Sequence, residues 1–235
     1  ELHGEFGEDG KVQKILRSRG IAYTGSGPEA SRDSFDKEIT KRILVQNGIS
    51  TPNHEVVSRS EERSLNFPLV VKPTCQGSSI GVHRVRSIEE WDNAARDVIS
   101  YGGRMLLEEF INGRELTVGV VGEEVLPVVE IRAPGSWYDY EAKYTSGKTE
   151  YLVPAPLEND CSDKCKDLAI KTFRALGCRG LGRIDMLLAQ DGGVYVLELN
   201  SIPGFTETSL LPKAAAIAGM DFPVLCGRIM EMAEL

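Results

Sequence analysis

Cysteine is scarce in this sequence, with only five in 235 residues: Cys75, Cys161, Cys165, Cys178 and Cys226. The number is odd, and no two of them have the C-x-x-C spacing of zinc knuckles and redox motifs. A disulfide framework and a structural zinc site are therefore both disfavoured. We expect reduced thiols and hence a cytoplasmic protein.

Long hydrophobic runs are missing as well. No uninterrupted apolar segment approaches the roughly 18 residues that a membrane-spanning helix needs, and no charged-then-apolar leader opens the chain. The sequence also lacks a basic stripe, and its formal net charge is −8. We therefore expect no membrane partner and no nucleic-acid partner.

What the sequence does contain is an ordinary globular composition with 41% hydrophobic residues, enough for one large domain or two small ones. Helical and strand patterns follow one another in a mixed α/β order. Helices are predicted at residues 11–19, 35–46, 88–100, 163–176, 209–218 and 222–232. Strands are predicted at residues 21–23, 55–57, 68–72, 80–85, 104–110, 115–121, 124–131 and 149–153, with a hairpin over 183–200.

The hairpin has the strongest local signal, because two β-prone segments flank Asp191-Gly192. A two-residue turn at this dipeptide places Asp185 opposite Glu198, about 5 Å apart. A three-residue turn using Gly193 would instead shift the register by one residue and move Asp185 off the face of Glu198.

Oxygen ligands gather on one face of this predicted hairpin. Alternate residues of a strand share a face, so Asp185, Glu198 and Asn200 project together, with Arg183 beside them. Two opposed carboxylates favour a cation between them, and magnesium prefers such ligands. A solvated surface hairpin is the alternative, but the many apolar neighbours favour a covered cleft.

A glycine-rich loop follows Lys72 and reads Gly77-Ser78-Ser79-Ile80-Gly81. It is not a Walker A loop, because there the lysine follows the glycines and opens a helix. Glycine lets backbone N–H groups approach phosphate oxygens, and serine hydroxyls add donors. The loop is either a flap over a triphosphate or a plain flexible connection, and the flanking lysine favours the flap.

Several motifs occur in an order that resembles the D-alanine:D-alanine ligases of the ATP-grasp superfamily. The resemblance covers nearly the whole chain and rests on the following segments: His3-Gly4-x-x-Gly7-Glu8-Asp9-Gly10, Tyr23-Thr24-Gly25-Ser26-Gly27, Asp36-Lys37, Lys72-Pro73 with Gly77-Ser78-Ser79-x-Gly81, Tyr140-Glu141-Ala142-Lys143-Tyr144, Gly182-Arg183-x-Asp185 and Glu198-x-Asn200-x-x-Pro203-Gly204. It implies an α/β (α+β) ATP-grasp fold, in which two α/β subdomains clamp the nucleotide. The expected boundaries are 1–33 for a remnant of an N-terminal α/β domain, 34–106 for the central subdomain and 107–235 for the catalytic subdomain.

The resemblance also implies roles for individual residues. Those expected to bind ATP are Lys37, Lys72, Gly77, Ser79, Glu108, Glu115 and Lys143. Catalytic roles fall to Ser78, Tyr144 and Arg183, with Arg183 clamping the transferring phosphoryl group. The magnesium ligands are Asp185, Glu198 and Asn200. The substrate contacts are His3, Gly204, Ser209 and Leu210.

The implied reaction joins two D-alanines through D-alanyl phosphate, for peptidoglycan precursor synthesis, with ATP and magnesium or manganese as cofactors. A homodimer is also implied. The resemblance further implies a strand–helix unit before His3, with a glutamate for the first amino acid's ammonium group. Three alternatives remain: a D-alanine:D-lactate ligase, disfavoured by Tyr144, another ATP-grasp carboxylate–amine ligase, and a nucleotide-binding fragment without turnover.

Overall fold

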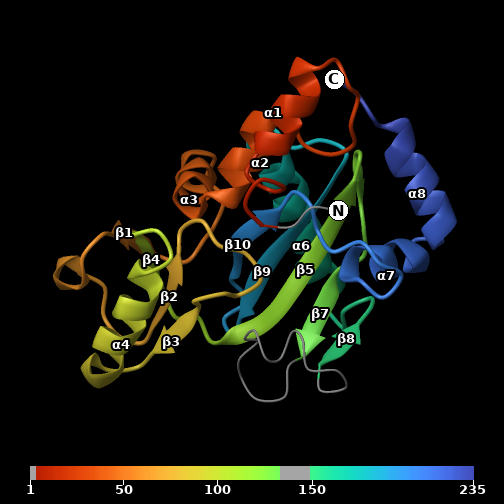
Figure 1. Ribbon diagram of the computed structural model, residues 1–235. Helices are drawn as coiled ribbons and strands as arrows, with labels where there is room; N and C mark the ends of the chain where they lie inside the picture. Colours follow the sequence, from red (N-terminus) through yellow and green to blue (C-terminus); the bar gives the residue numbers. More distant parts are fainter. Residues whose placement is uncertain (1–3, 133–148) are drawn as a thin grey trace.

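The computed structural model describes residues 4–132 and 149–235, and its strands form two separate antiparallel sheets (Figure 1). The smaller sheet has the strand order β1-β4-β2-β3, and the larger one has the order β10-β9-β5-β7-β8 with β6 paired to β5. Helices cover both sheets, as the ATP-grasp expectation requires.

The smaller sheet consists of β1 (His54–Val57), β2 (Leu69–Pro73), β3 (His83–Val85) and β4 (Met105–Glu109). Helix α4 (Ile88–Ile99) packs on it through Trp91 and Val98, which are buried with Leu69, Val71 and Met105. A short 3-10 helix, η1 (Ser60–Glu62), lies between β1 and β2. This compact layer has a hydrophobic core of its own.

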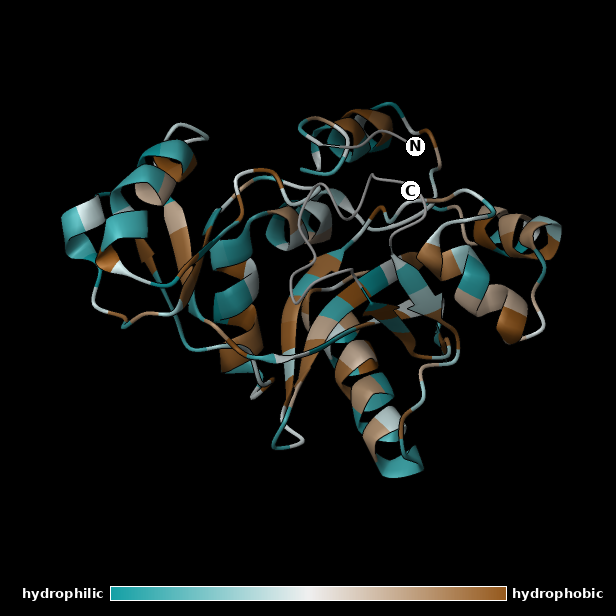
Figure 2. Ribbon diagram, turned by 90° about the horizontal axis from the view of Figure 1, so that it is seen from below, coloured by the Kyte–Doolittle hydropathy of each residue, from teal (hydrophilic) through white to brown (hydrophobic). Residues whose placement is uncertain are grey.

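The larger sheet contains β5 (Gly113–Val121), β6 (Glu124–Val125), β7 (Val129–Arg132), β8 (Glu150–Leu152), β9 (Leu181–Ala189) and β10 (Val194–Asn200). Helix α6 (Asn159–Ala175) packs on one face, against alternate residues such as Leu116, Val118 and Ile184. Hydrophobic residues follow these strands and the facing side of α6 (Figure 2). On the other face, α7 (Leu210–Ile217) and α8 (Phe222–Glu231) cover one end of the sheet through Leu211 and Leu225.

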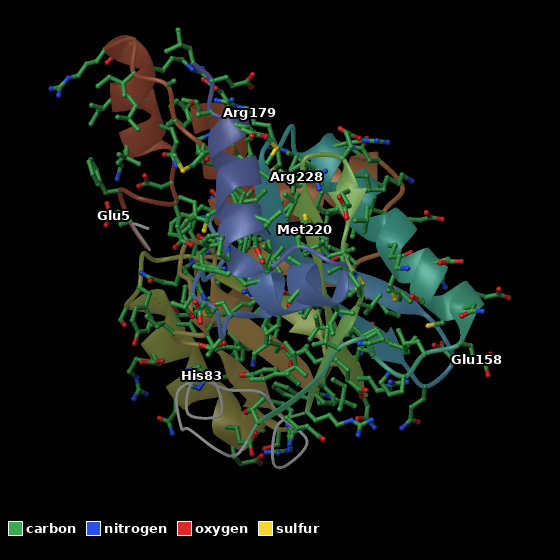
Figure 3. All side chains as sticks on the ribbon, turned by 90° about the vertical axis from the view of Figure 1, so that its right-hand side faces the viewer. Glu5, His83, Glu158, Arg179, Met220 and Arg228 are labelled. Atoms are coloured by element: carbon green, nitrogen blue, oxygen red, sulfur yellow. The ribbon has the colours of Figure 1, made fainter. Side chains whose placement is uncertain are left out.

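The N-terminal segment adds three helices, α1 (Lys11–Ser18), α2 (Pro28–Phe35) and α3 (Lys37–Gln46). Tyr23 forms an isolated antiparallel bridge with Glu234, with both N–H···O distances at 3.1 Å. Arg179, which is labelled near the top of Figure 3, forms an ion pair with the same Glu234. The first and last described segments are thereby joined.

Several predicted elements differ from the structure. Residues 21–23 form the single bridge rather than a strand, and α2 was missed because Gly27-Pro28 suggested a turn. Residues 124–131 divide into β6 and β7 on either side of Leu126-Pro127-Val128. Ile80 lies in the glycine loop, because Ser78 and Ser79 have left-handed φ angles of 55° and 59° and prevent an extended chain there.

The predicted two-residue turn in the β9–β10 hairpin is wrong, although its consequence holds. Ala189 N–H donates to the Gly193 carbonyl, which leaves a three-residue loop, and the register beside it is shifted by one residue. A bulge between Val196 and Glu198 then corrects the shift. Asp185 therefore pairs with Glu198 after all.

Of the helices in the described parts of the chain, none is by itself long and apolar enough to cross a membrane. Helices α7 and α8 pass that test only as a pair, and the chain bends by 104° between them.

Candidate active site

A cavity of about 440 Å³ lies between the two sheets. Its walls come from the start of α3, from β2, from the glycine loop, from the connection between β4 and β5, and from the uncovered face of the larger sheet. It combines an apolar wall with charged groups, which is the usual make-up of a small-molecule site. The predicted residues that line it are Lys37, Lys72, Gly77, Ser79, Glu108, Glu115, Asp185 and Glu198.

Lys37 is held at the cavity by the start of its helix. Asp36 caps α3 by accepting from the Glu38 and Ile39 N–H groups, and Lys37 N–H donates to the Thr74 carbonyl at 2.9 Å. The Lys37 ammonium donates to the Gln76 carbonyl at 2.5 Å and lies 3.3 Å from a Glu198 oxygen. A positive charge therefore stands between the glycine loop and the hairpin.

The glycine loop is held in an uncommon backbone conformation. Ser78 and Ser79 are both left-handed, a region in which non-glycine residues are rare and which occurs often at ligand sites. Gly77 and Ser79 line the cavity, whereas Ser78 is not among its lining residues in the described chain. The loop thus lines the same cavity as Lys72, at the end of β2.

Glu108 is a buried carboxylate between two buried lysines. Its Oε2 lies 2.6 Å from the Lys72 ammonium, and its Oε1 pairs with the Lys41 ammonium. Although burial opposes ionisation, the two ammonium groups hold the pKa of Glu108 down at about 2. Burial also lowers the pKa of Lys41 to about 8, whereas the nearby carboxylates raise that of Lys72. Glu108 lines the cavity mainly as the anchor of Lys72.

Asp185 is the centre of the hairpin cluster. Arg183 binds it through two parallel N–H···O bonds of 2.8 and 2.7 Å, and the Asn200 amide donates to it at 3.0 Å. The Thr117 hydroxyl, on the neighbouring strand β5, donates to it at 2.6 Å. These bonds fix the orientation of the carboxylate with respect to Glu198, its partner across the hairpin.

The oxygen groups at this hairpin fit a magnesium ion. Asp185 and Glu198 are directly paired, and two opposed carboxylates favour a cation between them. Among the described residues, no group of three or more His, Cys, Asp and Glu could hold a metal alone. Two carboxylates, the Asn200 amide and phosphate oxygens of a bound nucleotide match the usual magnesium arrangement.

The remaining predicted residues line a smaller cavity, lie in the described chain away from both cavity walls, or fall outside the described residues. Asn200 lines a second cavity of about 30 Å³, which shares Lys37, Gly77 and Glu198 with the larger one. Ser209 precedes α7, which begins at Leu210, and its hydroxyl accepts from Thr206 N–H at 3.0 Å; a side chain at Gly204 would meet that hydroxyl. His3, Lys143 and Tyr144 fall outside the described residues.

Four functional features were missed from the sequence. Lys41 and Thr117 act through tertiary contacts that only the sheet order reveals. Leu197 faces the cavity because of the bulge. Glu130, also in the cavity wall, is bound by Arg114 at 2.8 and 2.9 Å and by Arg132 at 3.1 Å. Of these four residues, only Lys41 gave a signal in the sequence, because a lysine stands within the apolar pattern of α3.

Comparison with known proteins decides the family. The family model described as "D-ala D-ala ligase C-terminus" matches residues 38–231, which include both sheets and the residues of the cavity wall except Lys37. The chain belongs to the D-alanine–D-alanine ligase family. A D-alanine–D-alanine ligase of Methylacidiphilum infernorum is 44% identical over 100% of this chain and 77% of its own length.

Solved D-alanine–D-alanine ligase structures agree with the fold. One from Bacillus anthracis is 36% identical with a TM-score of 0.86, and covers 98% of this chain and 77% of its own. A second, complexed with ATP, has a TM-score of 0.85 at 36% identity, with coverages of 98% and 76%. The ATP-grasp prediction made from the sequence is therefore confirmed, and the chain spans about three quarters of these relatives.

Proposed function

We propose that this protein uses ATP and magnesium to join two D-alanines into D-alanyl-D-alanine, a precursor of peptidoglycan. The proposal rests on one observation above all. Two lysines and two paired carboxylates face a single cavity in a chain that is 44% identical to a D-alanine–D-alanine ligase.

The cavity supplies complementary groups for each part of ATP. The apolar wall that includes Val70 and Leu197 suits the adenine ring, and the Glu115 carboxylate suits a ribose hydroxyl. Lys37 and Lys72 offset phosphate charge from two sides, and the loop N–H groups at Gly77 add donors. Lys143 is proposed to join them.

Asp185, Glu198 and Asn200 are proposed to hold magnesium, which when bound would neutralise phosphate charge. Arg183, already oriented by Asp185, is proposed to donate to the transferring phosphoryl group. Its planar guanidinium matches two oxygens at once, which a lysine would not do.

The reaction then proceeds in two steps. An oxygen of the first D-alanine carboxylate attacks the γ-phosphorus of ATP and the bond to ADP breaks, which gives D-alanyl phosphate. The amine of the second D-alanine attacks the carbonyl carbon, phosphate leaves, and the amine loses a proton. Arg183 and backbone N–H groups would stabilise the oxyanion, and positioning supplies much of the rate.

An acyl phosphate hydrolyses readily, so water must be excluded during the reaction. The segment 74–82, with its left-handed Ser78 and Ser79, is the proposed cover on one side. We propose that Ser78, in this segment, and Tyr144 contact the substrate. We also propose that His3, Gly204, Ser209 and Leu210 surround the two D-alanines.

We also propose a location, an oligomeric state and domain boundaries. All five cysteines are free thiols, which fits a cytoplasmic location. A homodimer is proposed from the family resemblance. The proposed domain boundaries, 1–33, 34–106 and 107–235, place most of the smaller sheet in the central part, although β4 extends to Glu109.

The test is an assay of D-alanine-dependent ADP release, with D-alanyl-D-alanine identified by mass spectrometry. We expect product only when ATP, magnesium and D-alanine are all present. If the protein binds ATP but releases no phosphate when any amino acid is added, the proposal is contradicted and a nucleotide-binding module is favoured. A faster reaction with D-lactate as acceptor would reassign the second substrate.

A further inference from the structure

The peptide of Val196, at the bulge of β10, is held by groups from outside the larger sheet. Its N–H donates to the Ser50 carbonyl at 2.8 Å. Its carbonyl accepts from the Thr51 hydroxyl at 2.8 Å and from the Lys41 ammonium at 3.4 Å. Val196 itself is paired with Met186, but β10 is the edge strand of its sheet, so the outward N–H and carbonyl of Val196 need partners from outside the sheet.

The position of this peptide matters because Leu197 and Glu198 follow it directly and both line the cavity. Val196 itself is fully buried against the core on the α6 side. Two contacts therefore fix the direction of the Glu198 side chain. One is the buried Val196, two residues before it, and the other is the pairing of Glu198 with Asp185.

Lys41, which bonds to the Val196 carbonyl, is also linked to the lysine on the phosphate side of the cavity. Lys41 is 1% exposed, bonds to the Thr51 hydroxyl, and pairs with Glu108, whose second oxygen holds Lys72. Lys41 is not among the lining residues of the cavity in the described chain. It contacts groups on both sheets, so it joins the bulge to the lysine that faces the nucleotide.

We propose that Thr51 and Lys41 are positioning residues, which hold the Val196 carbonyl and thereby fix Glu198 for binding the metal–nucleotide complex. This inference rests on the proposed function, because it takes Glu198 as a magnesium ligand. Neither residue is proposed to contact substrate. Thr51 acts through the Val196 carbonyl, whereas Lys41 acts there and also through Glu108, which holds Lys72.

The test compares Thr51→Val, which removes the hydroxyl at nearly constant shape, with Thr51→Ser, which keeps it. ADP affinity is measured by calorimetry with and without magnesium. We expect the magnesium-dependent gain in affinity to fall about tenfold in Thr51→Val, while metal-free ADP affinity stays at the wild-type value. Thr51→Ser should keep the gain, and Lys41→Met should lower metal-free ADP affinity as well, because Lys41 also pairs with Glu108 beside Lys72.

A double-mutant cycle with Glu198→Gln shows whether the effect passes through Glu198. Glu198→Gln alone should remove most of the magnesium-dependent gain, and adding Thr51→Val should then change nothing more. The matched control is Thr172→Val, since the buried Thr172 hydroxyl has no hydrogen-bond partner in the described structure. This control should bind ADP as the wild type does, with and without magnesium.

The outcomes separate the two proposals. If Glu198→Gln keeps the full magnesium-dependent gain, the metal site in the proposed function fails. If Glu198→Gln loses the gain but Thr51→Val retains it, the positioning role alone is overturned. Equal losses with and without magnesium in Thr51→Val would also overturn it, because they indicate a merely structural residue. Thermal melting of each variant confirms that a folded protein is being compared.

Discussion

Among single residues, Glu108 shows most clearly how charge is managed inside this molecule. It is 2% exposed, yet its pKa is about 2 because Lys41 and Lys72 bind both of its oxygens. Removing the Glu108 carboxylate would leave two buried ammonium groups without a counterion, which is usually strongly destabilising. The cluster therefore contributes to folding as well as to the cavity.

Glu108 predicts an acid-sensitive part of the stability. Its pKa is lower in the folded protein than its ordinary value of 4.5, so its contribution is complete above pH 4.5 and is lost as the pH falls through about 2. Glu108→Gln should unfold more easily than wild type at pH 6, by a few kcal/mol, and this difference should shrink toward pH 2.5. Urea unfolding at both pH values measures it.

The exposed Glu207→Gln serves as the control, and its difference from wild type should stay small at both pH values. A stability difference for Glu108→Gln that does not change with pH would show that the carboxylate charge is not what matters.

Arg183 leads to a prediction about catalysis. Arg183→Ala should lower the ligation rate by roughly a hundredfold or more, because a preorganised donor to developing charge is lost. The fold should survive, since Asp185 keeps its bonds to Thr117 and Asn200. Arg228→Ala on α8 is the matched control, because this arginine bonds to Glu124 and not to the hairpin cluster. Near-normal D-alanine-dependent ADP release in Arg183→Ala would reject its role.

At the scale of elements, the sequence predicted most helices and strands but not how the β9–β10 hairpin reaches its register. Asp-Gly favoured a two-residue turn, whereas the structure combines a three-residue loop with a bulge. The bulge lets Val196 and Leu199 both face the core while Leu197 and Glu198 both face the cavity. No local pattern shows this, because it depends on packing against α6.

The start of α2 could have been predicted. Pro28 is at the first helical turn, where proline is favoured because its missing N–H needs no partner there. Its neighbours Ser26 and Gly27 suggested a turn instead. Lys41 is a different case, because its partners come from β4 and β10, and their distance in sequence hides the contact.

The bulge gives a prediction of its own. Leu197→Ala removes part of the apolar cavity wall without touching a charged group. Loss of about 1 kcal/mol of apolar contact should weaken ATP binding roughly fivefold. The magnesium-dependent part of the affinity should stay unchanged, which calorimetry with and without the metal can measure. A selective loss of magnesium dependence would instead show that Leu197 orients Glu198.

At the scale of the whole molecule, the cavity lies between two layers with separate cores. A nucleotide that contacts both should hold them together. We expect saturating ATP analogue with magnesium, at about 100 times its Kd, to raise stability by roughly 2.7 kcal/mol. Amide hydrogen exchange should slow in both β2 and β10. Slowing in one sheet only would contradict a site shared by the two layers.

The sequence predicted this general architecture because an ordered set of motifs resembles one family across nearly the whole chain. It did not reveal the division into four- and six-stranded sheets, since strand order depends on pairings such as β5 with β9. Those pairings bring Thr117 beside Asp185, a contact that spans 68 residues of sequence.

The charged cluster of Lys41, Glu108 and Lys72 also limits how this protein can evolve. Loss of Glu108 leaves two buried ammonium groups without their shared counterion, so its single replacement passes through an unstable intermediate. These three positions should consequently be retained together, or exchanged together, as lineages diverge. Thr51, whose hydroxyl bonds to the same ammonium group, should vary in step with Lys41.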